Sequence, residues 1–155
     1  MGQYESRLAA LIIHFLYDFL DQHDLGIVLA PDGPLRLSQA LVRMPDVSFV
    51  SWSRLPDRAV TKEAVLAAAP DLAIEILSKG NTPKEMERKL REYFDAGVTL
   101  VWYIDPATHS AVSYASIDQP VPHDQDTPLD ASPVLPGFQL SLKTLFARVG
   151  SPSDE

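Results

Sequence analysis

The sequence predicts a mixed α/β or α+β domain built around one sheet, with helices packed against it. Three observations support this prediction: a helical pattern opens the chain, several apolar runs have strand character, and a clearly bounded helix separates two of them. The length of 155 residues and the hydrophobic content of 46% suit one domain with one core. We expect residues 1–150 to form that domain and residues 151–155 to form a disordered tail.

The first half of the chain predicts one helix followed by strands. Helical spacing of apolar residues predicts a helix over Tyr4–His23, with Gly26 as its stop. The segment "APDGPLRL" is typical of a turn between two strands, and "RMPDVSFVSW" predicts another strand with Pro45 at its entrance. The loop "SRLPDRAVTKEAVLAAA" then leads to a strand over Asp71–Leu77.

The helix after that strand has the clearest boundaries. Thr82 is a suitable N-cap, Pro83 suits the first helical position, Glu85 completes a capping box, and Gly97 suits the C-terminal end. "VTLVWYID" and "SAVSYAS" predict two strands paired through the "PATH" turn. Residues 119–132 predict an exposed loop, because polar residues and prolines dominate without a period. "VLPGFQLSLKTLFARV" predicts a strand and a closing helix.

Composition excludes several classes of function. The absence of cysteine excludes disulfides, zinc–thiolate sites and cysteine nucleophiles. Neither a membrane-spanning apolar run nor a signal-peptide pattern is found, and the absence of cysteine leads us to expect a cytoplasmic protein. The net charge of −8 disfavours broad neutralisation of nucleic-acid phosphates, so basic residues would have to act on DNA locally. An acidic site for a divalent metal is the easier inference from charge.

Glu75 is the most informative residue, because it lies within an apolar strand. Alternation places Leu72, Ile74 and Ile76 on one face and Glu75 on the other, among small or apolar neighbours. Burial of an unpaired carboxylate is costly, so Glu75 needs a cation, a hydrogen-bond donor or a proton. Pairing with an arginine or exposure of this face to solvent would also explain it; a role as metal ligand requires further partners.

Asp46 and Lys89 are the candidate partners. Asp46 follows Pro45 and opens a strand, as Asp71 does after Pro70, although aspartate is also common at strand ends. Lys89 lies at the edge of the apolar stripe of its helix, so its ammonium should reach a polar group near the protein body. A helical pair with Glu85 is the simpler alternative for Lys89.

Two carboxylates and a lysine suit phosphodiester hydrolysis. The carboxylates would hold Mg²⁺ or Mn²⁺, and the lysine would orient a water or offset developing charge. Neighbouring charged residues on the helix, Arg88, Arg91 and Glu92, are predicted to lie on its solvent side.

The segments "RMPDVSFV", "APDLAIEILS", "NTPKEMERKLREYFDAGVTLVWYIDP" and "LPGFQLSL" together resemble the Uma-two family of restriction endonucleases, related to the PD-(D/E)XK nuclease superfamily. The resemblance implies a restriction-endonuclease-like mixed central sheet flanked by helices and a Mg²⁺-dependent deoxyribonuclease. By position, it implies that Asp46 and Glu75 bind the metal and that Asp46, Glu75 and Lys89 are catalytic. DNA is the implied partner, and a homodimer is expected by analogy.

Two departures from the family pattern keep an alternative open. Lysine usually follows the acidic residue by two positions in the wider superfamily, and Leu77 occupies that position here. Members also usually begin with an E-x-x-x-G-E hairpin, whereas this chain starts almost at the first helix. The missing hairpin and the acidic balance of the chain favour the alternative function, a catalytically inactive interaction or regulatory domain, whereas Lys89 is a suitable substitute for the lysine. A sugar or acyl hydrolase is disfavoured by the lack of G-x-S-x-G, and the four histidines are expected at the surface or in the core rather than as ligands.

Overall fold

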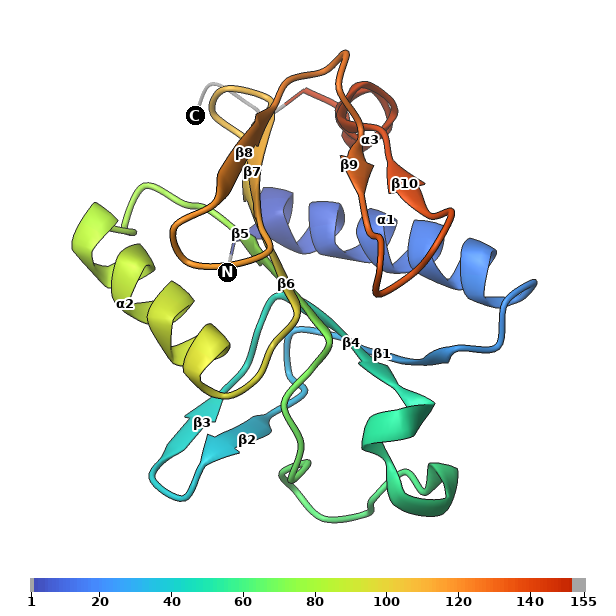
Figure 1. Ribbon diagram of the computed structural model, residues 1–155. Helices are drawn as coiled ribbons and strands as arrows, with labels where there is room; N and C mark the ends of the chain where they lie inside the picture. Colours follow the sequence, from blue (N-terminus) through green and yellow to red (C-terminus); the bar gives the residue numbers. More distant parts are fainter. Residues whose placement is uncertain (1, 152–155) are drawn as a thin grey trace.

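A six-stranded mixed sheet forms the central layer of the protein, described here over residues 2–151 of a computed structural model (Figure 1). Its strands lie in the order β1-β4-β5-β6-β7-β8. Their bounds are β1 Gly26–Leu29, β4 Val47–Ser51, β5 Leu72–Ile76, β6 Leu100–Asp105, β7 Ser110–Tyr114 and β8 Pro120–His123. Only β5 and β6 pair in parallel within this sheet. The predicted mixed α/β (α+β) class is confirmed.

The central strand β5 explains why a helix follows it. All five residues of β5 are buried, between β4 on one side and β6 on the other. Because β5 and β6 run parallel, the chain must return to the end of the sheet where β5 begins before β6 can start. Helix α2 (Pro83–Asp95) makes that return. The predicted succession of strand, capped helix and strand is therefore confirmed.

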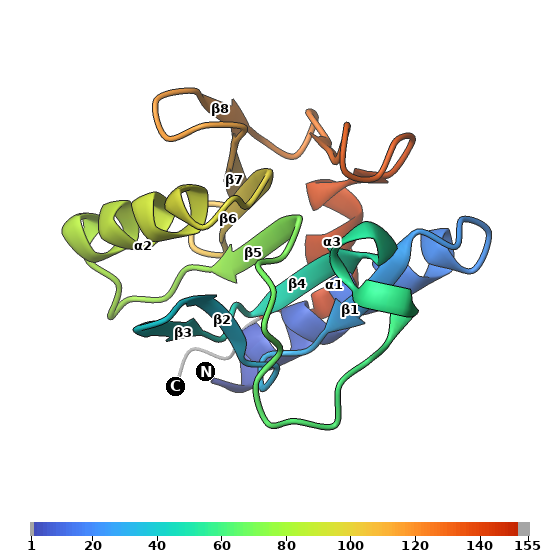
Figure 2. The same ribbon diagram turned by 60° about the horizontal axis from the view of Figure 1, so that its bottom comes forward.

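Helices cover both faces of the sheet. Figure 2 shows α1 (Gln3–Leu20) and α3 (Leu142–Val149) on one side of β5 and β6, and α2 on the other. The two faces of β5 follow the predicted alternation: Leu72, Ile74 and Ile76 belong to the core under α1 and α3, and Ala73 belongs to the core under α2. Glu75 shares the α2 face with Ala73.

The ends of α2 are set by its sequence. The Thr82 side chain accepts a hydrogen bond from the Glu85 N–H at 3.2 Å, and Pro83 is the first helical residue. Beyond the C-cap Ala96, Gly97 has φ of +92°, a conformation that favours glycine. The predicted boundaries are confirmed, and they fix which α2 side chains face β5.

Two predictions about local structure are wrong. Gly26 does not stop the first helix, which ends at Leu20; it begins β1, where the Val50 carbonyl approaches too closely for a Cβ. Residues 119–132 are not one loop, because they contain β8 and the short strand β9 (Leu129–Asp130). Pro120 and Pro122 point their missing N–H groups to the same side of β8, so the other side can pair with β7 at the sheet edge.

Smaller elements surround this framework. A hairpin of β2 (Leu35–Ser38) and β3 (Leu41–Arg43) precedes β4, and two short 3-10 turns, Trp52–Arg54 and Pro56–Arg58, follow it. Strand β9 pairs with β10 (Gln139–Leu140). No helix within residues 2–151 is long and apolar enough to cross a membrane. Residues 152–155 of the predicted tail lie outside the described residues.

Candidate active site

Strand register places Asp46 opposite Glu75. Val47 pairs with Ile74 in the antiparallel β4–β5 ladder, and one step further along the ladder Asp46 faces Glu75. Directly opposed residues of an antiparallel pair have Cβ atoms about 4.5–5.5 Å apart. The side chain of Asp46 is also held in place, because its carboxylate accepts a hydrogen bond from the backbone N–H of Ile76 at 2.7 Å. Two carboxyl groups thus meet at the end of β5.

Helix α2 brings two further groups to Glu75. The Lys89 Nζ lies 3.6 Å from a Glu75 carboxylate oxygen, and the Tyr93 hydroxyl donates a hydrogen bond to the same oxygen. Lys89 and Tyr93 are one helical turn apart, so both side chains project from α2 toward β5. Glu75 itself is 5% exposed. The carboxylate is therefore buried, but it has an ammonium and a hydroxyl as partners.

Burial dominates the electrostatics of the two carboxyl groups. It raises the pKa of Glu75 from its ordinary 4.5 to about 7, although Lys89 and the Tyr93 hydrogen bond pull that pKa down. Burial also raises the pKa of Asp46, against the opposing effects of the Ile76 N–H and Lys89. The negative charge of Asp46 also raises the pKa of Glu75. Near neutral pH, the site without a cation therefore has less negative charge than two full carboxylates.

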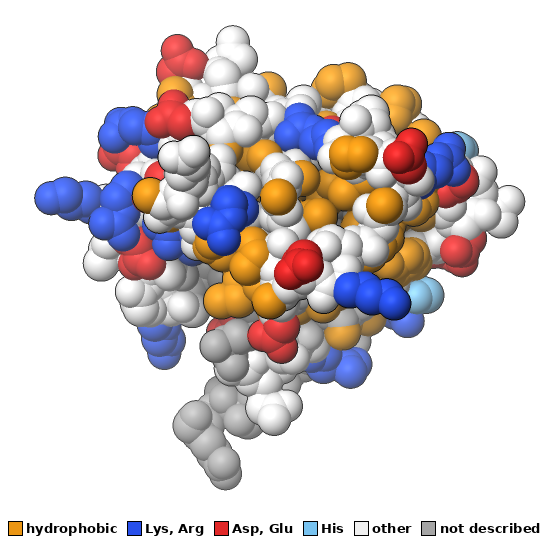
Figure 3. Space-filling model, turned by 90° about the horizontal axis from the view of Figure 1, so that it is seen from below, with side chains coloured by type: hydrophobic (Ala, Val, Ile, Leu, Met, Phe, Trp, Pro, Cys, Tyr) orange, Lys and Arg blue, Asp and Glu red, His pale blue; other side chains and the backbone are white. Residues whose placement is uncertain are grey.

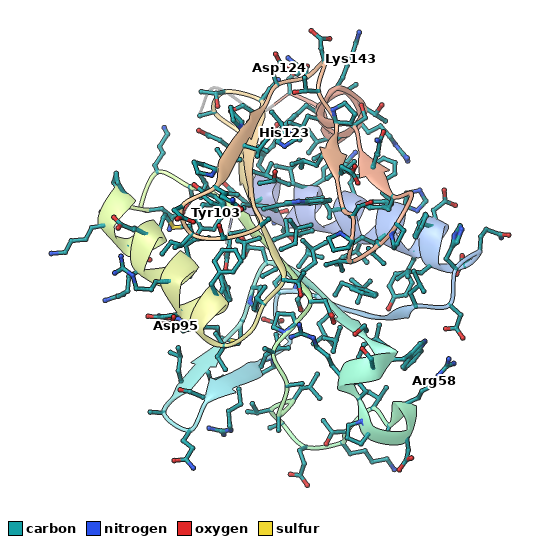
Figure 4. All side chains as sticks on the ribbon, in the orientation of Figure 1. Arg58, Asp95, Tyr103, His123, Asp124 and Lys143 are labelled. Carbon is teal, nitrogen blue, oxygen red and sulfur yellow. The ribbon has the colours of Figure 1, made fainter. Side chains whose placement is uncertain are left out.

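Tyr103 belongs to the same face but is held elsewhere. It pairs with Glu75 in the parallel β5–β6 ladder and lies between the sheet and α2 (Figure 4). Its hydroxyl donates to the Met86 carbonyl at 2.6 Å. Burial, and then the nearby Glu75, raise the pKa of Tyr103, which keeps it a neutral donor. Tyr103 therefore anchors α2 against the sheet and so positions Lys89 and Tyr93.

Asp46, Glu75 and Lys89 line a cleft of about 530 Å³. Besides Asp46, Glu75 and Lys89, its wall is formed by Gly2, Glu5, Ile76, Ser78, Lys79, Gly80, Asn81 and Met86. Glu5, from the first turn of α1, adds an acidic residue that sequence reasoning missed. Within residues 2–151, no three His, Asp or Glu side chains form a group able to hold a metal ion. The candidate ligands are thus the two carboxylates of Asp46 and Glu75.

Several sequence expectations about these residues are now decided. Glu75 does not pair with an arginine or face solvent, and Lys89 approaches Glu75 within ion-pair distance. The prediction that Glu92 lies on the solvent side is wrong: it is partly buried and accepts a hydrogen bond from Arg43 Nε at 2.7 Å. Its partner comes from β3, a strand far away in sequence, and no helical pattern could reveal it. Tyr93 was missed as a partner of Glu75, although its spacing from Lys89 was a usable signal.

The four histidines lie away from the cleft. His123 Nε2 is 2.9 Å from Ser113 Oγ between β7 and β8. His109 stacks on Phe146, and His23 stacks on Phe19. His14 is exposed on α1. None of these side chains lines the cleft.

Comparisons with known proteins give one family and one fold. The profile of the Uma2 family, described as "Putative restriction endonuclease", matches residues 1–143. The fold is similar to the crystal structure of "a putative nuclease belonging to DUF820" from Anabaena variabilis ATCC 29413, with a TM-score of 0.83. That pair is 18% identical in sequence, and the match covers 97% of this chain and 84% of the other. No curated protein matches the chain.

Proposed function

The chain belongs to the Uma2 family, whose description is "Putative restriction endonuclease", and from this premise we propose that it is a metal-dependent endonuclease that hydrolyses DNA phosphodiester bonds. The observation that carries the proposal is the meeting of Asp46, Glu75 and Lys89 in one cleft. The two carboxyl groups come from adjacent strands and the lysine from the helix that packs on them.

The donor set fits Mg²⁺ or Mn²⁺. Both ions prefer hard oxygen ligands, and Mg²⁺ keeps several waters, so two protein carboxylates suffice. Burial raises the pKa values of Asp46 and Glu75 and so disfavours their charged forms, which a divalent cation would stabilise. When bound, the ion would polarise a phosphoryl oxygen and make a coordinated water more acidic.

The residues of the chain itself would then orient the reactants. The Ile76 N–H holds the Asp46 carboxylate, and the Tyr93 hydroxyl holds that of Glu75, so neither ligand has to reorganise. The Lys89 ammonium, 3.6 Å from Glu75, would orient the attacking water or offset charge that develops on the phosphate. Lys89 thus replaces the superfamily lysine that Leu77 cannot supply.

A cleavage assay with matched variants tests this proposal. Purified protein is incubated with plasmid DNA and Mn²⁺ or Mg²⁺, beside Asp46→Asn, Glu75→Gln and a control, Glu63→Gln, at an exposed loop position. We expect nicking by the wild type and by the control, and none by the two cleft variants. Equal nicking by Glu75→Gln would mean that the activity comes from another site or a contaminant.

A non-catalytic interaction or regulatory domain is the second candidate. The net charge of −8 favours it, because the chain has few cations to spare for DNA phosphates. On the face shown in Figure 3, basic side chains lie among acidic ones. Calorimetry separates the two candidates: a folded sample that takes up no Mn²⁺ at millimolar concentration would favour the second. A homodimer stays a prediction, which light scattering on the purified protein would test.

A further inference from the structure

A second cavity of about 550 Å³ adjoins the cleft. The two share a wall formed by Glu5, Ser78, Lys79, Asn81 and Met86. From this wall the second cavity, called here the side groove, extends to the turn after β6, at residues 105–107. A molecule held at Glu75 would therefore lie next to the side groove.

The side groove differs from the cleft in chemistry. Its wall adds Tyr4, Leu77, Pro83 and Pro106, so most of the surface beyond the shared residues is apolar or aromatic. Tyr4 is partly buried and packs against the core under α1, which limits the movement of its ring. A volume of this size lies within the range of about 300–1,000 Å³ that is typical of small-ligand pockets. The groove thus offers a preformed apolar slot beside a charged site.

The junction of the two cavities has one basic side chain, Lys79, beside the acidic Glu5, and Asp105 lines the far end of the side groove. Lys79 is exposed and lines both of them, and Thr82 at the N-terminal end of α2 lines the side groove. The positive end of the helix dipole and a lysine ammonium both stabilise a phosphate group. From the cleft to the side groove, the wall therefore passes from the two carboxyl groups, past Lys79 and Glu5, to a mainly apolar surface.

We propose that the side groove binds an unpaired nucleobase next to the scissile phosphate, so that single-stranded or locally unpaired DNA is the preferred substrate. This inference rests on the proposed nuclease function. A paired, stacked base cannot enter a slot in a protein wall, whereas an unstacked base exposes an apolar face that aromatic side chains bind. Tyr4 supplies that aromatic surface, and Lys79 contacts the adjoining phosphate.

Three labelled oligonucleotides test the proposal: a single strand, the same strand with abasic sites flanking the cleaved bond, and the matched duplex. Cleavage with Mn²⁺ is compared among wild type, Tyr4→Ala, Ala107→Trp and Tyr17→Ala. Ala107 is exposed and lines the side groove, so a tryptophan there would fill the groove without disturbing the core. Tyr17 is 43% exposed on the same helix as Tyr4 but lines neither cavity, which makes it the matched control.

We expect the wild type and Tyr17→Ala to cleave the single strand faster than the abasic strand or the duplex. Tyr4→Ala and Ala107→Trp should lose roughly tenfold in kcat/KM on the single strand, the scale of one base stacked on an aromatic ring, with little change on the abasic strand. Equal losses on both strands, no loss in either variant, or equal wild-type cleavage of the duplex would each overturn the proposal.

A binding measurement keeps this inference separate from the nuclease proposal. Fluorescence anisotropy with Ca²⁺ in place of Mn²⁺ gives the affinity of each protein for the same three oligonucleotides. If the wild type cleaves none of them but binds the single strand about tenfold more tightly than the abasic strand, and Ala107→Trp removes that preference, the nuclease proposal fails and the side groove stands. If wild type cleaves DNA but shows no preference for bases, only the side groove is wrong.

Discussion

Each end of the β4–β5 ladder carries a Pro-Asp dipeptide, but the charged groups around the two aspartates differ. Pro45-Asp46 precedes β4, and Pro70-Asp71 precedes β5. Each aspartate accepts a backbone N–H from the far end of the neighbouring strand: Asp46 from Ile76 at 2.7 Å, and Asp71 from Ser51 at 2.6 Å. The hydrogen-bonding role of the "PD" motif is therefore the same at both ends.

The partners of the two aspartates are different. Arg54 Nε lies 3.0 Å from the Asp71 carboxylate, and the same guanidinium donates to the carbonyls of Ala69, Pro70 and Gly97. Across the ladder from Asp71 stands Val50, by the register that places Glu75 across from Asp46. The Asp71 end is thus a neutralised junction between loops.

The comparison shows that the "PD" motif alone does not make a site. The Asp46 end has two carboxyl groups and one ammonium 3.6 Å away, and it opens into the cleft. The Asp46 end has Glu75 and Lys89, where the Asp71 end has Val50 and Arg54. The second carboxyl group adds a negative charge that the single ammonium does not balance, and this is the basis of the proposed cation site. Four predictions test this distinction, from the largest expected effect to the smallest.

Removing charge at the two ends should affect different properties. We expect Asp46→Asn and Glu75→Gln to lower the rate of DNA cleavage by about 10²-fold or more, because each removes a group that would stabilise charge in the reaction. Asp71→Asn should leave the rate nearly unchanged at a temperature where it is folded. Steady-state cleavage of one oligonucleotide by the three variants checks this. A large loss in Asp71→Asn would abolish the distinction between the two ends.

Arg54→Ala should destabilise the fold by roughly 3 kcal/mol, because it leaves Asp71 and several carbonyl groups without their donor. Lys89→Ala should cost much less in unfolding free energy, since Glu75 can take up a proton when its ammonium partner is lost. Urea denaturation at pH 6 measures both. Equal costs would indicate that Lys89 has the same structural role as Arg54.

The metal-free protein should lose stability as pH rises from about 4.5 to 7. Burial raises the pKa of folded Glu75 to about 7, so in this range the folded protein binds a proton that the unfolded chain has released. The slope of unfolding free energy with pH is therefore negative, with a total change of at most roughly 3 kcal/mol. Denaturation in EDTA at several pH values measures it. Glu75→Gln should flatten the curve, and Asp71→Asn should preserve it.

Tyr93→Phe should have the smallest effect. Its hydroxyl donates to Glu75, and this hydrogen bond lowers the pKa of the carboxyl group. The variant should therefore raise the pH at which Glu75 releases its proton and cost about 1.5 kcal/mol above that pH, where the acceptor is charged. The same pH series measures the midpoint. An unchanged midpoint would show that Tyr93 does not stabilise the carboxylate.

The sequence by itself determined the elements whose signals are local. The two-residue alternation in β5 placed Glu75 on the face away from its aliphatic neighbours. Thr82 and Gly97 marked the two ends of α2. With α2 bounded, its 3.6-residue period turned Lys89 toward the protein body. These predictions are confirmed because dihedral preferences and side-chain alternation act between residues close in the chain.

Only the tertiary structure decided which of these side chains meet. Asp46 faces Glu75 because β4 and β5 pair in one register across a connection of 20 residues, and a shift of one residue would turn the aspartate to the other face. The same holds for Tyr93 at Glu75 and for Arg43 at Glu92. Such contacts depend on the packing of segments distant in sequence, which no local pattern encodes.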